Sequence, residues 1–207
     1  MPKYEVILSR GLINTSLSCY FIKLTGYDHK RNVRANMGTR IIALENYNAN
    51  WPTLYDTEQV LVKNIIGDNL IASHHIGSTS VANLPAKAII DILLEVSNLS
   101  ALENSYLPLE NIGYVAKGEN GIAGRRYFQK GGMQRSHHLH VFKQGSVEVI
   151  RHLAFRNYLR KHPDIAQEYG ELKYRIAQQC ENSNQVYMAG KGDFIKKHLA
   201  LAMTENF

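Results

Sequence analysis

The chain has 207 residues, of which 44% are hydrophobic and 20% charged, the balance of an ordinary globular protein with one domain-sized core. No apolar run approaches the ~20 residues that span a bilayer, and the N-terminus lacks the pattern of a secretory signal. The two cysteines, Cys19 and Cys180, fit a reducing compartment, so we expect a cytoplasmic protein with no membrane partner.

The positive charge is concentrated at the N-terminal end. Residues 1–36 hold six Lys/Arg and two acids, a net charge of +4 out of the formal +6 of the chain. We expect 1–36 to be a basic extension of uncertain order, either a disordered tail or a segment ahead of a natural start at Met37, and 37–207 to be the folded domain. Because little excess charge falls in 37–207, the core is not expected to bind nucleic acid.

Beyond residue 40, short apolar runs alternate with helical patterns. Strands are predicted at 41–44, 70–76, 88–96, 114–116, 125–130 and 137–142. Helices are predicted at 53–66, 99–112 with a break near Pro108, 146–160, 163–179 and 192–203. Pro52, Ser146 and Pro163 are typical of helix starts. Strands mixed with helices, followed by three helices, predict an α+β fold: a mixed β-sheet core flanked by helices, with a helical C-terminal portion.

The strand at 70–76 ends in a glycine that three hydroxyl residues follow: Gly77, Ser78, Thr79 and Ser80. Glycine lets the backbone turn sharply and approach a ligand closely. Hydroxyl groups and exposed backbone N–H groups then hold phosphate oxygens. The four residues are therefore a candidate phosphate-binding turn, and a plain turn with a Ser or Thr helix cap is the alternative.

Asp91 interrupts the next strand, which is apolar on both faces, as expected of a central strand. A lone buried carboxylate costs several kcal/mol unless a metal, a cation or several hydrogen-bond donors compensate it. Asp91 is thus a candidate metal ligand, with a structural salt bridge to Lys87 or to an arginine as the alternative.

Taken together, these segments resemble the signature of the GrpB family, also called UPF0157, which is placed in the nucleotidyltransferase superfamily. The resemblance rests on three runs: His75-Ile76-Gly77-Ser78-Thr79-Ser80-Val81, Leu84-Pro85-Ala86-Lys87 and Ile89-Ile90-Asp91-Ile92. Weaker matches continue in colinear order over about 40–203, including Arg126-Tyr127-Phe128, His138-Leu139-His140 and Leu172-Lys173. Residues 1–36 lie outside it.

The resemblance implies a nucleotidyltransferase-like sheet and a Mg²⁺- or Mn²⁺-dependent site. By that likeness Gly77 and Ser78 contact the phosphates of a nucleoside triphosphate, and Asp91 binds the metal. Active members of the superfamily carry a second acid two residues further on, but this chain has Leu93 there. The metal pattern of the superfamily is therefore incomplete in this chain. An apolar residue at this position resembles the common GrpB pattern.

His138 and His140 alternate with Leu139, so both rings should lie on one strand face, ~7 Å apart at the backbone. If their strand lies beside that of Asp91, the two histidines could replace the missing acid as metal ligands or as catalytic groups. A structure with the pair on the opposite sheet face from Asp91 would remove this hypothesis. Histidines that are simply packed within a sheet are the alternative.

Several basic residues are candidates to offset phosphate charge. Arg125, Arg126 and Lys130 share a predicted strand, in which Arg126 and Lys130 lie on one face. Solvated sheet-edge charges are the alternative, favoured more for Arg125 than for Arg126. Lys87 is the favoured candidate, since it lies close in sequence to both Ser78 and Asp91. Lys191, which follows Tyr187 just ahead of the last helix, could close over a ligand or could simply be exposed.

Three functions follow from these patterns. The first is transfer of a nucleotidyl group from a nucleoside triphosphate to an unknown acceptor, with Asp91 on the metal and Lys87 or Arg126 on the developing charge. The second is a non-catalytic module that binds a nucleotide or a ligand like coenzyme A, since the family resemblance also suggests a link to coenzyme A metabolism. The third is a metal-dependent hydrolase using His138, His140 and Asp91.

Overall fold

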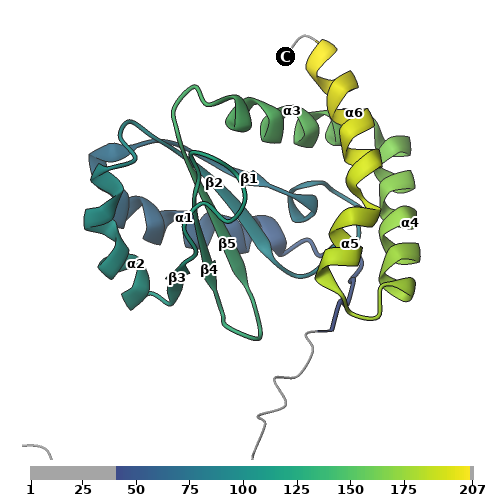
Figure 1. The fold of residues 1–207 in the computed structure, drawn as a ribbon, viewed down its shortest axis with the longest axis horizontal. Coiled ribbons are helices and arrows are strands. Elements are labelled where there is room, and N and C mark those ends of the chain that lie inside the picture. Colours follow the sequence, from purple (N-terminus) through teal and green to yellow (C-terminus); the bar gives the residue numbers. More distant parts are fainter. Residues whose placement is uncertain (1–40, 206–207) are drawn as a thin grey trace, which may run out of the picture. The chain divides into compact units, whose positions relative to one another are not determined.

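The computed structural model describes residues 41–205, and the predicted extension at 1–36 lies outside them. Five strands form one mixed sheet in the order β1-β2-β5-β4-β3. They span Leu70–Ile76 (β1), Ile90–Val96 (β2), Tyr114–Ala116 (β3), Arg126–Lys130 (β4) and His137–Lys143 (β5). β2 pairs parallel with β5, and the other neighbours are antiparallel. The mixed α+β architecture predicted from the sequence is confirmed (Figure 1).

Six α-helices and three short 3-10 helices are described around this sheet. The α-helices span Trp51–Ile66 (α1), Tyr106–Asn111 (α2), Val147–Lys161 (α3), Pro163–Gln179 (α4), Asn184–Gly190 (α5) and Gly192–Thr204 (α6). The 3-10 helices span Gly67–Asn69 (η1), Ser78–Ser80 (η2) and Ala101–Ser105 (η3). Within residues 41–205, no helix is both long and apolar enough to cross a membrane.

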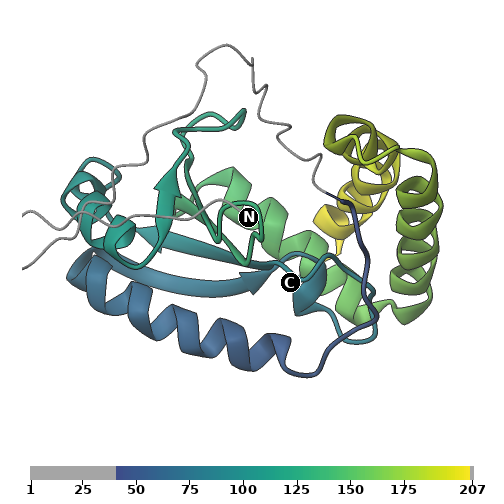
Figure 2. The same cartoon turned by 90° about the horizontal axis from the view of Figure 1, so that it is seen from below.

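One face of the sheet, the α1 face, packs against α1 and α2. Its core includes Ile92 and Leu94 of β2, Val141 of β5 and, from α1, Trp51 and Val62. In Figure 2 the long helix α1 runs beneath the sheet, with α3 on the other side. The amphipathic spacing of α1 and the alternation of the strands place these apolar residues on a common interface.

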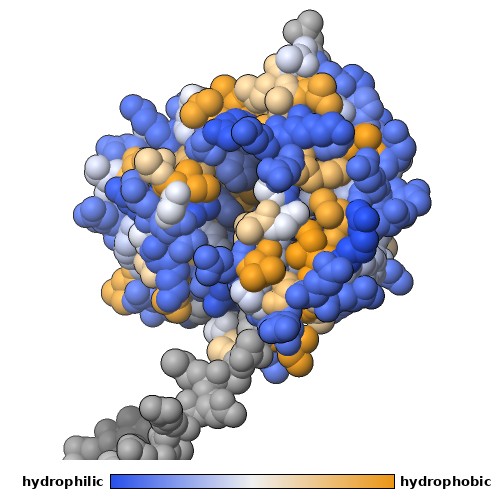
Figure 3. Space-filling view, turned by 45° about the vertical axis from the view of Figure 1, so that its right-hand side comes forward, coloured by the Kyte–Doolittle hydropathy of each residue, from blue (hydrophilic) through white to orange (hydrophobic). Residues whose placement is uncertain are grey.

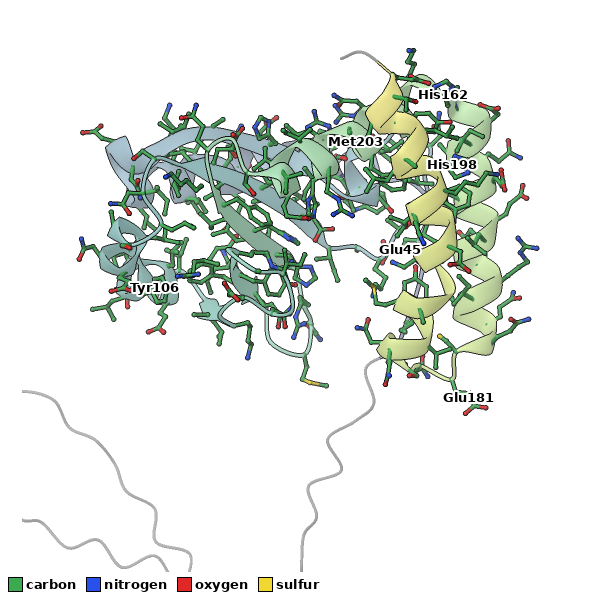
Figure 4. The ribbon with its side chains drawn as sticks, turned by 45° about the horizontal axis from the view of Figure 1, so that its top comes forward. Glu45, Tyr106, His162, Glu181, His198 and Met203 are labelled. Atoms are coloured by element: carbon green, nitrogen blue, oxygen red, sulfur yellow. The ribbon has the colours of Figure 1, made fainter. Side chains whose placement is uncertain are left out.

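The other face, the cleft face, bears Leu93 and Phe142, which pack with Ile76 and with Val149 of α3. Further along, α3, α4 and α6 form a separate core that includes Leu159 and Tyr169. Figure 4 shows how far the fold extends: Tyr106 marks α2 at one end of the sheet, and His198 marks α6 at the other. Because Leu93 packs with Ile76, Phe142 and Val149, it has a packing role on the cleft face.

One strand prediction was wrong, one helix differs in where it is broken, and one helix was not predicted. The expected strand at 41–44 is absent from the described chain, which has only a single bridge there, between Glu45 and Ala86. The helix expected at 99–112 is broken, as predicted, but the break lies between η3 and α2, just before Pro108, which is within α2. The short helix α5 has Ser183 as its cap, accepting a hydrogen bond from the N–H of Val186. Ser146 caps α3 in the same way, as predicted.

Candidate functional site

Asp91 lies in β2 directly opposite His138 of β5, and both side chains are on the cleft face. Its Oδ1 atom is 2.9 Å from Nδ1 of His138 and 3.5 Å from Nε2 of His140. The parallel pairing of two central strands creates this cluster, because it aligns residues 47 positions apart in the chain. The condition set for the histidine hypothesis, a shared sheet face, is thus met.

The cluster is largely enclosed. The side chains of Asp91, His138 and His140 are 26%, 18% and 12% exposed. Burial alone would raise the pKa of Asp91, but the hydrogen bonds and charges of His138 and His140 hold that pKa well below its ordinary value. Burial lowers the pKa of His140 in spite of the attraction of Asp91. The cluster is therefore a carboxylate flanked by two imidazoles.

Arg125 determines the hydrogen-bonding pattern of His140. Its Nη1 atom lies 3.3 Å from Nδ1 of His140. A guanidinium can only donate, so Nδ1 of His140 accepts and the ring hydrogen of neutral His140 lies on Nε2, toward Asp91. Nε2 of His138 is buried and has no hydrogen-bond partner among the described residues. It is the ring nitrogen best placed to bind a ligand.

Gly77 allows the turn after β1 to approach this cluster. Its backbone has φ 69° and ψ −175°, a conformation almost restricted to glycine. A Cβ added at Gly77 would collide with Oδ2 of Asp91. The turn continues as the 3-10 helix η2, whose N-cap residue is Gly77, and no side chain forms a capping hydrogen bond there. The Gly77 bend therefore lies directly against Asp91.

The three hydroxyl residues of the turn have different surroundings. Ser78 accepts a hydrogen bond from Nζ of Lys173 at 2.9 Å. Thr79 is buried and bonds to His75 and to the carbonyl of Ile89, while the hydroxyl of Ser80 donates to the carbonyl of Gly77. Ser78 is therefore the hydroxyl most available to a ligand, and Thr79 and Ser80 hold the turn in place.

A cavity of about 840 Å³, called the cleft below, opens over the cluster. Figure 3 shows the surface hollowed between the sheet and the C-terminal helices. Five cationic residues line the cleft: Lys87, Arg125, Arg135, Lys173 and Lys191. Among the described residues that line it, Asp91 is the only carboxylate. The lining therefore carries an excess of positive charge.

Lys173 is the least expected of these cations, since sequence reasoning gave it no role. It is only 2% exposed, donates to Ser78 and to the carbonyl of Pro85, and lies 4.7 Å from the ring centre of Tyr169. Within residues 41–205 it forms no ion pair with a carboxylate. Burial, with a smaller contribution from Lys191, lowers the pKa of Lys173 to about 7.

Lys191 and Lys87 approach the cleft from different elements. Both lie over the ring of Tyr187, at 4.6 Å and 4.8 Å from its centre, and Lys87 also donates to Asn184 at 3.4 Å. Burial, followed by the repulsion of Lys87, lowers the pKa of Lys191 to about 8. The expectation that Lys87 and Lys191 lie near the Asp91 site agrees with this placement.

Two of the predicted phosphate ligands lie elsewhere. Tyr127 and Gln129 of β4 pair with His140 and His138 on the cleft face, so Arg126 and Lys130 are on the α1 face. Lys130 bonds to both carboxylate oxygens of Glu58, at 2.8 Å and 2.9 Å. Arg125, for which a solvated edge charge is the favoured alternative, is instead 5% exposed and lines the cleft. The shared face of Arg126 and Lys130 was predicted correctly, but its location was wrong.

Comparison with known proteins identifies relatives that share this fold. A sequence profile of the family described as GrpB protein matches residues 41–201. The UPF0157 protein YqkA of Bacillus subtilis is 49% identical over 150 residues, covering 72% of this chain and 44% of YqkA. The glutamate-rich protein GrpB of Alkalihalophilus pseudofirmus is 31% identical over 163 residues, covering 76% of this chain and 94% of that protein.

A crystal structure of a relative is also similar. The conserved protein GrpB from Enterococcus faecalis superposes with a TM-score of 0.75 and 42% sequence identity, over 78% of this chain and 97% of that one. The chain spans less than half of YqkA, so that relative carries additional sequence. The similarity covers the sheet, the cleft and the helices around them.

Proposed function

The chain belongs to the GrpB family, and we propose that its cleft binds a nucleoside triphosphate and transfers a nucleotidyl group from it to an acceptor. One observation carries this proposal: among the described residues, five cationic side chains and one carboxylate line a cavity that also includes Ser78 of the turn after Gly77. A polyphosphate is the ligand class that balances this charge, because lysine and arginine offset phosphate charge directly.

The residues at the bend would hold the phosphates. Ser78 and Lys173 are already joined by a hydrogen bond and would bind the terminal phosphate oxygens as a pair. Lys87 and Lys191, close together over Tyr187, would offset the charge that develops on the leaving pyrophosphate. Arg125 and Arg135, on the sheet side of the cleft, would contact the remaining phosphate or the sugar.

Asp91, His138 and His140 fit a single divalent ion. One ligand atom from each lies within 4.8 Å of those of the other two, and Nε2 of His138 is buried without a partner among the described residues. An ion held there would polarise phosphoryl oxygens and assist ionisation of the acceptor. Two nitrogen ligands and one carboxylate favour Mn²⁺ or Zn²⁺ over Mg²⁺, which prefers oxygen. For His140 to act as a ligand, the hydrogen on its Nε2 would have to be displaced, because its Nδ1 faces Arg125.

Thermal unfolding tests the proposal directly. The four ribonucleoside triphosphates and coenzyme A precursors should be tested with Mg²⁺, Mn²⁺, Zn²⁺ or a chelator. A ligand at 100 times its dissociation constant should add about 2.7 kcal/mol to the free energy of unfolding. We expect triphosphate stabilisation that requires Mn²⁺ and is lost in Asp91→Asn and Lys173→Met. No stabilisation of the wild type by any triphosphate would contradict the proposal.

The matched control is Arg126→Met, on the α1 face of β4, which should leave triphosphate binding unchanged. Release of pyrophosphate from a triphosphate would then distinguish transfer from binding alone. Stabilisation without pyrophosphate release favours a binding module. Hydrolysis of a phosphoester with Zn²⁺ but no triphosphate stabilisation favours the second candidate, a metal-dependent hydrolase, which the Asp91, His138 and His140 cluster supports.

A further inference from the structure

A second cavity, called the apolar pocket below, lies between the end of β1 and the helices α3, α4 and α6. Its volume is about 340 Å³, within the range of small-molecule sites. Its apolar walls include Ile76, Val81, Phe155, Leu159, Ile195 and Leu199. These walls contrast with the cationic lining of the cleft and indicate a ligand with an uncharged body.

The apolar pocket and the cleft meet at the candidate site. Ser78, Asp91, His140 and Met188 line both cavities. The carboxylate of Asp91 therefore stands between a region suited to polyphosphate and a region suited to an apolar group. A molecule in the apolar pocket can extend one end to the phosphates bound beside Asp91.

The charges that line the apolar pocket balance in number, with Asp91 and Glu148 against Arg151 and Arg156. Arg151 lies 3.2 Å from the carboxylate of Glu148. Arg156 donates to the backbone carbonyl of His75 and to the side chain of Asn157. In the cleft, by contrast, Lys173 forms no ion pair with a carboxylate within residues 41–205. The pocket therefore has no excess charge to offer a second phosphate or carboxylate.

From this arrangement we infer that the apolar pocket binds the acceptor, and that the acceptor is an alcohol or amine carried on an aromatic or short aliphatic body. The inference rests on the proposed function. In the reaction, the acceptor oxygen or nitrogen forms a bond to the α-phosphorus of the triphosphate. The bond between that phosphorus and the bridging oxygen breaks, pyrophosphate leaves with the electron pair, and the acceptor proton is released to water.

The test uses 2-phenylethanol and ethanol as acceptors, with each ribonucleoside triphosphate labelled at the α-phosphate and with MnCl₂. For the wild type we expect the phenylethyl ester to form at least ten times faster than the ethyl ester, because burial of an aromatic group favours binding. Ligand-observed NMR should also detect 2-phenylethanol bound to the nucleotide-free protein. Equal rates for the two alcohols, or no bound signal, would overturn the inference.

Leu199→Trp fills the apolar pocket, and Leu201→Trp, on the exposed side of the same helix, is its control. The first should lower phenylethyl transfer at least tenfold and remove the NMR signal, while triphosphate stabilisation stays at the wild-type level. The control should change neither. An unaltered preference in a folded Leu199→Trp protein refutes the inference.

A second variant covers the case in which Leu199→Trp does not fold. Ile195→Ala enlarges the same wall and should raise the rate with 2-(1-naphthyl)ethanol relative to 2-phenylethanol, and an unchanged ratio would count against the pocket. The two proposals fail separately. Triphosphate binding and pyrophosphate release without apolar preference reject only the acceptor, whereas no triphosphate binding rejects the proposed function and the acceptor with it.

Discussion

The two faces of the sheet differ in whether a carboxylate pairs with a largely buried lysine. On the α1 face, Lys130 is paired with Glu58, and His137 lies 3.9 Å from the same carboxylate. On the cleft face, Lys173 is as deeply buried as a core residue but forms no ion pair with a carboxylate within residues 41–205. The first arrangement is complete in the folded chain, whereas we propose that a bound anion completes the second.

The comparison teaches that burial alone does not separate structural from functional cations. The side chain of Lys130 is 23% exposed and Lys173 is 2% exposed, and both contact an aromatic ring, Lys130 at 5.5 Å from Tyr114 and Lys173 at 4.7 Å from Tyr169. The difference is whether an acid compensates the charge. Removing each lysine in turn should therefore give effects of different kind.

The largest effect is expected from Lys130→Met, which leaves the buried Glu58 without its lysine partner. We predict that this variant loses about 3–5 kcal/mol of unfolding free energy, as in other proteins where one partner of a buried pair is removed. Lys173→Met, the matched change on the cleft face, should shift the free energy of unfolding by no more than about 1 kcal/mol, because it also removes a desolvated charge.

Urea denaturation of both variants at pH 7 measures the difference. Triphosphate stabilisation should show the reverse order, with Lys130→Met retaining it and Lys173→Met losing it. Two variants destabilised equally, with equal loss of ligand, would break the comparison between the faces.

The pH dependence of stability tests the α1 face through His75. This residue lies on the α1 face, stacked on Tyr55 at 4.9 Å, and burial lowers its pKa to about 4. The unfolded chain, with a pKa near 6.5, takes up the proton first as the pH falls. Stability should therefore decrease between pH 6.5 and 4, by as much as ~3 kcal/mol from this residue.

The free energy of unfolding at several pH values, in wild type and His75→Phe, measures this contribution. The phenyl ring retains the stacking on Tyr55 and cannot titrate, so its pH profile should be flatter over the same window. Parallel profiles for the two proteins would show that His75 contributes no pH dependence.

A substitution at Gly77 tests the cleft face, because this glycine allows the turn after β1 to lie against Asp91. Gly77→Ala adds a Cβ in a backbone conformation that non-glycine residues avoid, and the new atom meets the carboxylate. We predict a loss of about 1–3 kcal/mol in unfolding free energy and weaker Mn²⁺ binding.

Gly67→Ala is the matched control, since Gly67 has φ 59° and ψ −140° but no neighbouring atom within 4 Å of the added Cβ. It should show the backbone strain without the effect on Mn²⁺, which titration calorimetry of both variants can measure. Equal Mn²⁺ affinity in the two variants would mean that the bend does not position Asp91.

The sequence predicts the parts of this fold that local patterns determine. The bounds of β1, β3 and α4 agree with the structure, and Ser146 and Pro163 begin α3 and α4 as expected. The strand expected at 41–44 is wrong because its apolar residues pack instead in an extended segment, with Ile42 in a core with Cys180 and Tyr187. These two packing partners lie about 140 residues further along the chain, so the sequence around Ile42 carries no local signal of the contact.

Site residues were predicted where a residue type is unusual in its local sequence. They were missed where their position depends on how helices and strands pack together. Asp91 and Gly77 were identified because an acid in an apolar strand and a glycine at a strand end are unusual. The face of Arg126 depends on the register between β4 and β5, a non-local pairing. Lys173 looks like any helix lysine until α4 packs on Pro85, so closely that a Cβ on Gly170 would touch the proline ring.

The smallest effect, and the most specific to the cleft face, is the pH dependence of anion binding. The pKa values of about 7 for Lys173 and about 8 for Lys191 mean that both lose charge as the pH rises from 7 to 9. A bound polyphosphate favours the charged lysines, so binding in this range must take up protons and affinity must fall as the pH rises. One titrating lysine weakens binding by up to about tenfold per pH unit above its pKa.

Calorimetry of triphosphate binding at pH 8, in buffers of different ionisation enthalpy, counts the protons taken up. We expect a positive number in the wild type and a smaller one in Lys173→Met. Arg126→Met, on the α1 face, should match the wild type. Affinity that stays constant from pH 7 to 9 would show that these lysines keep their charge without a ligand, and the contrast between the two faces would then lose its physical basis.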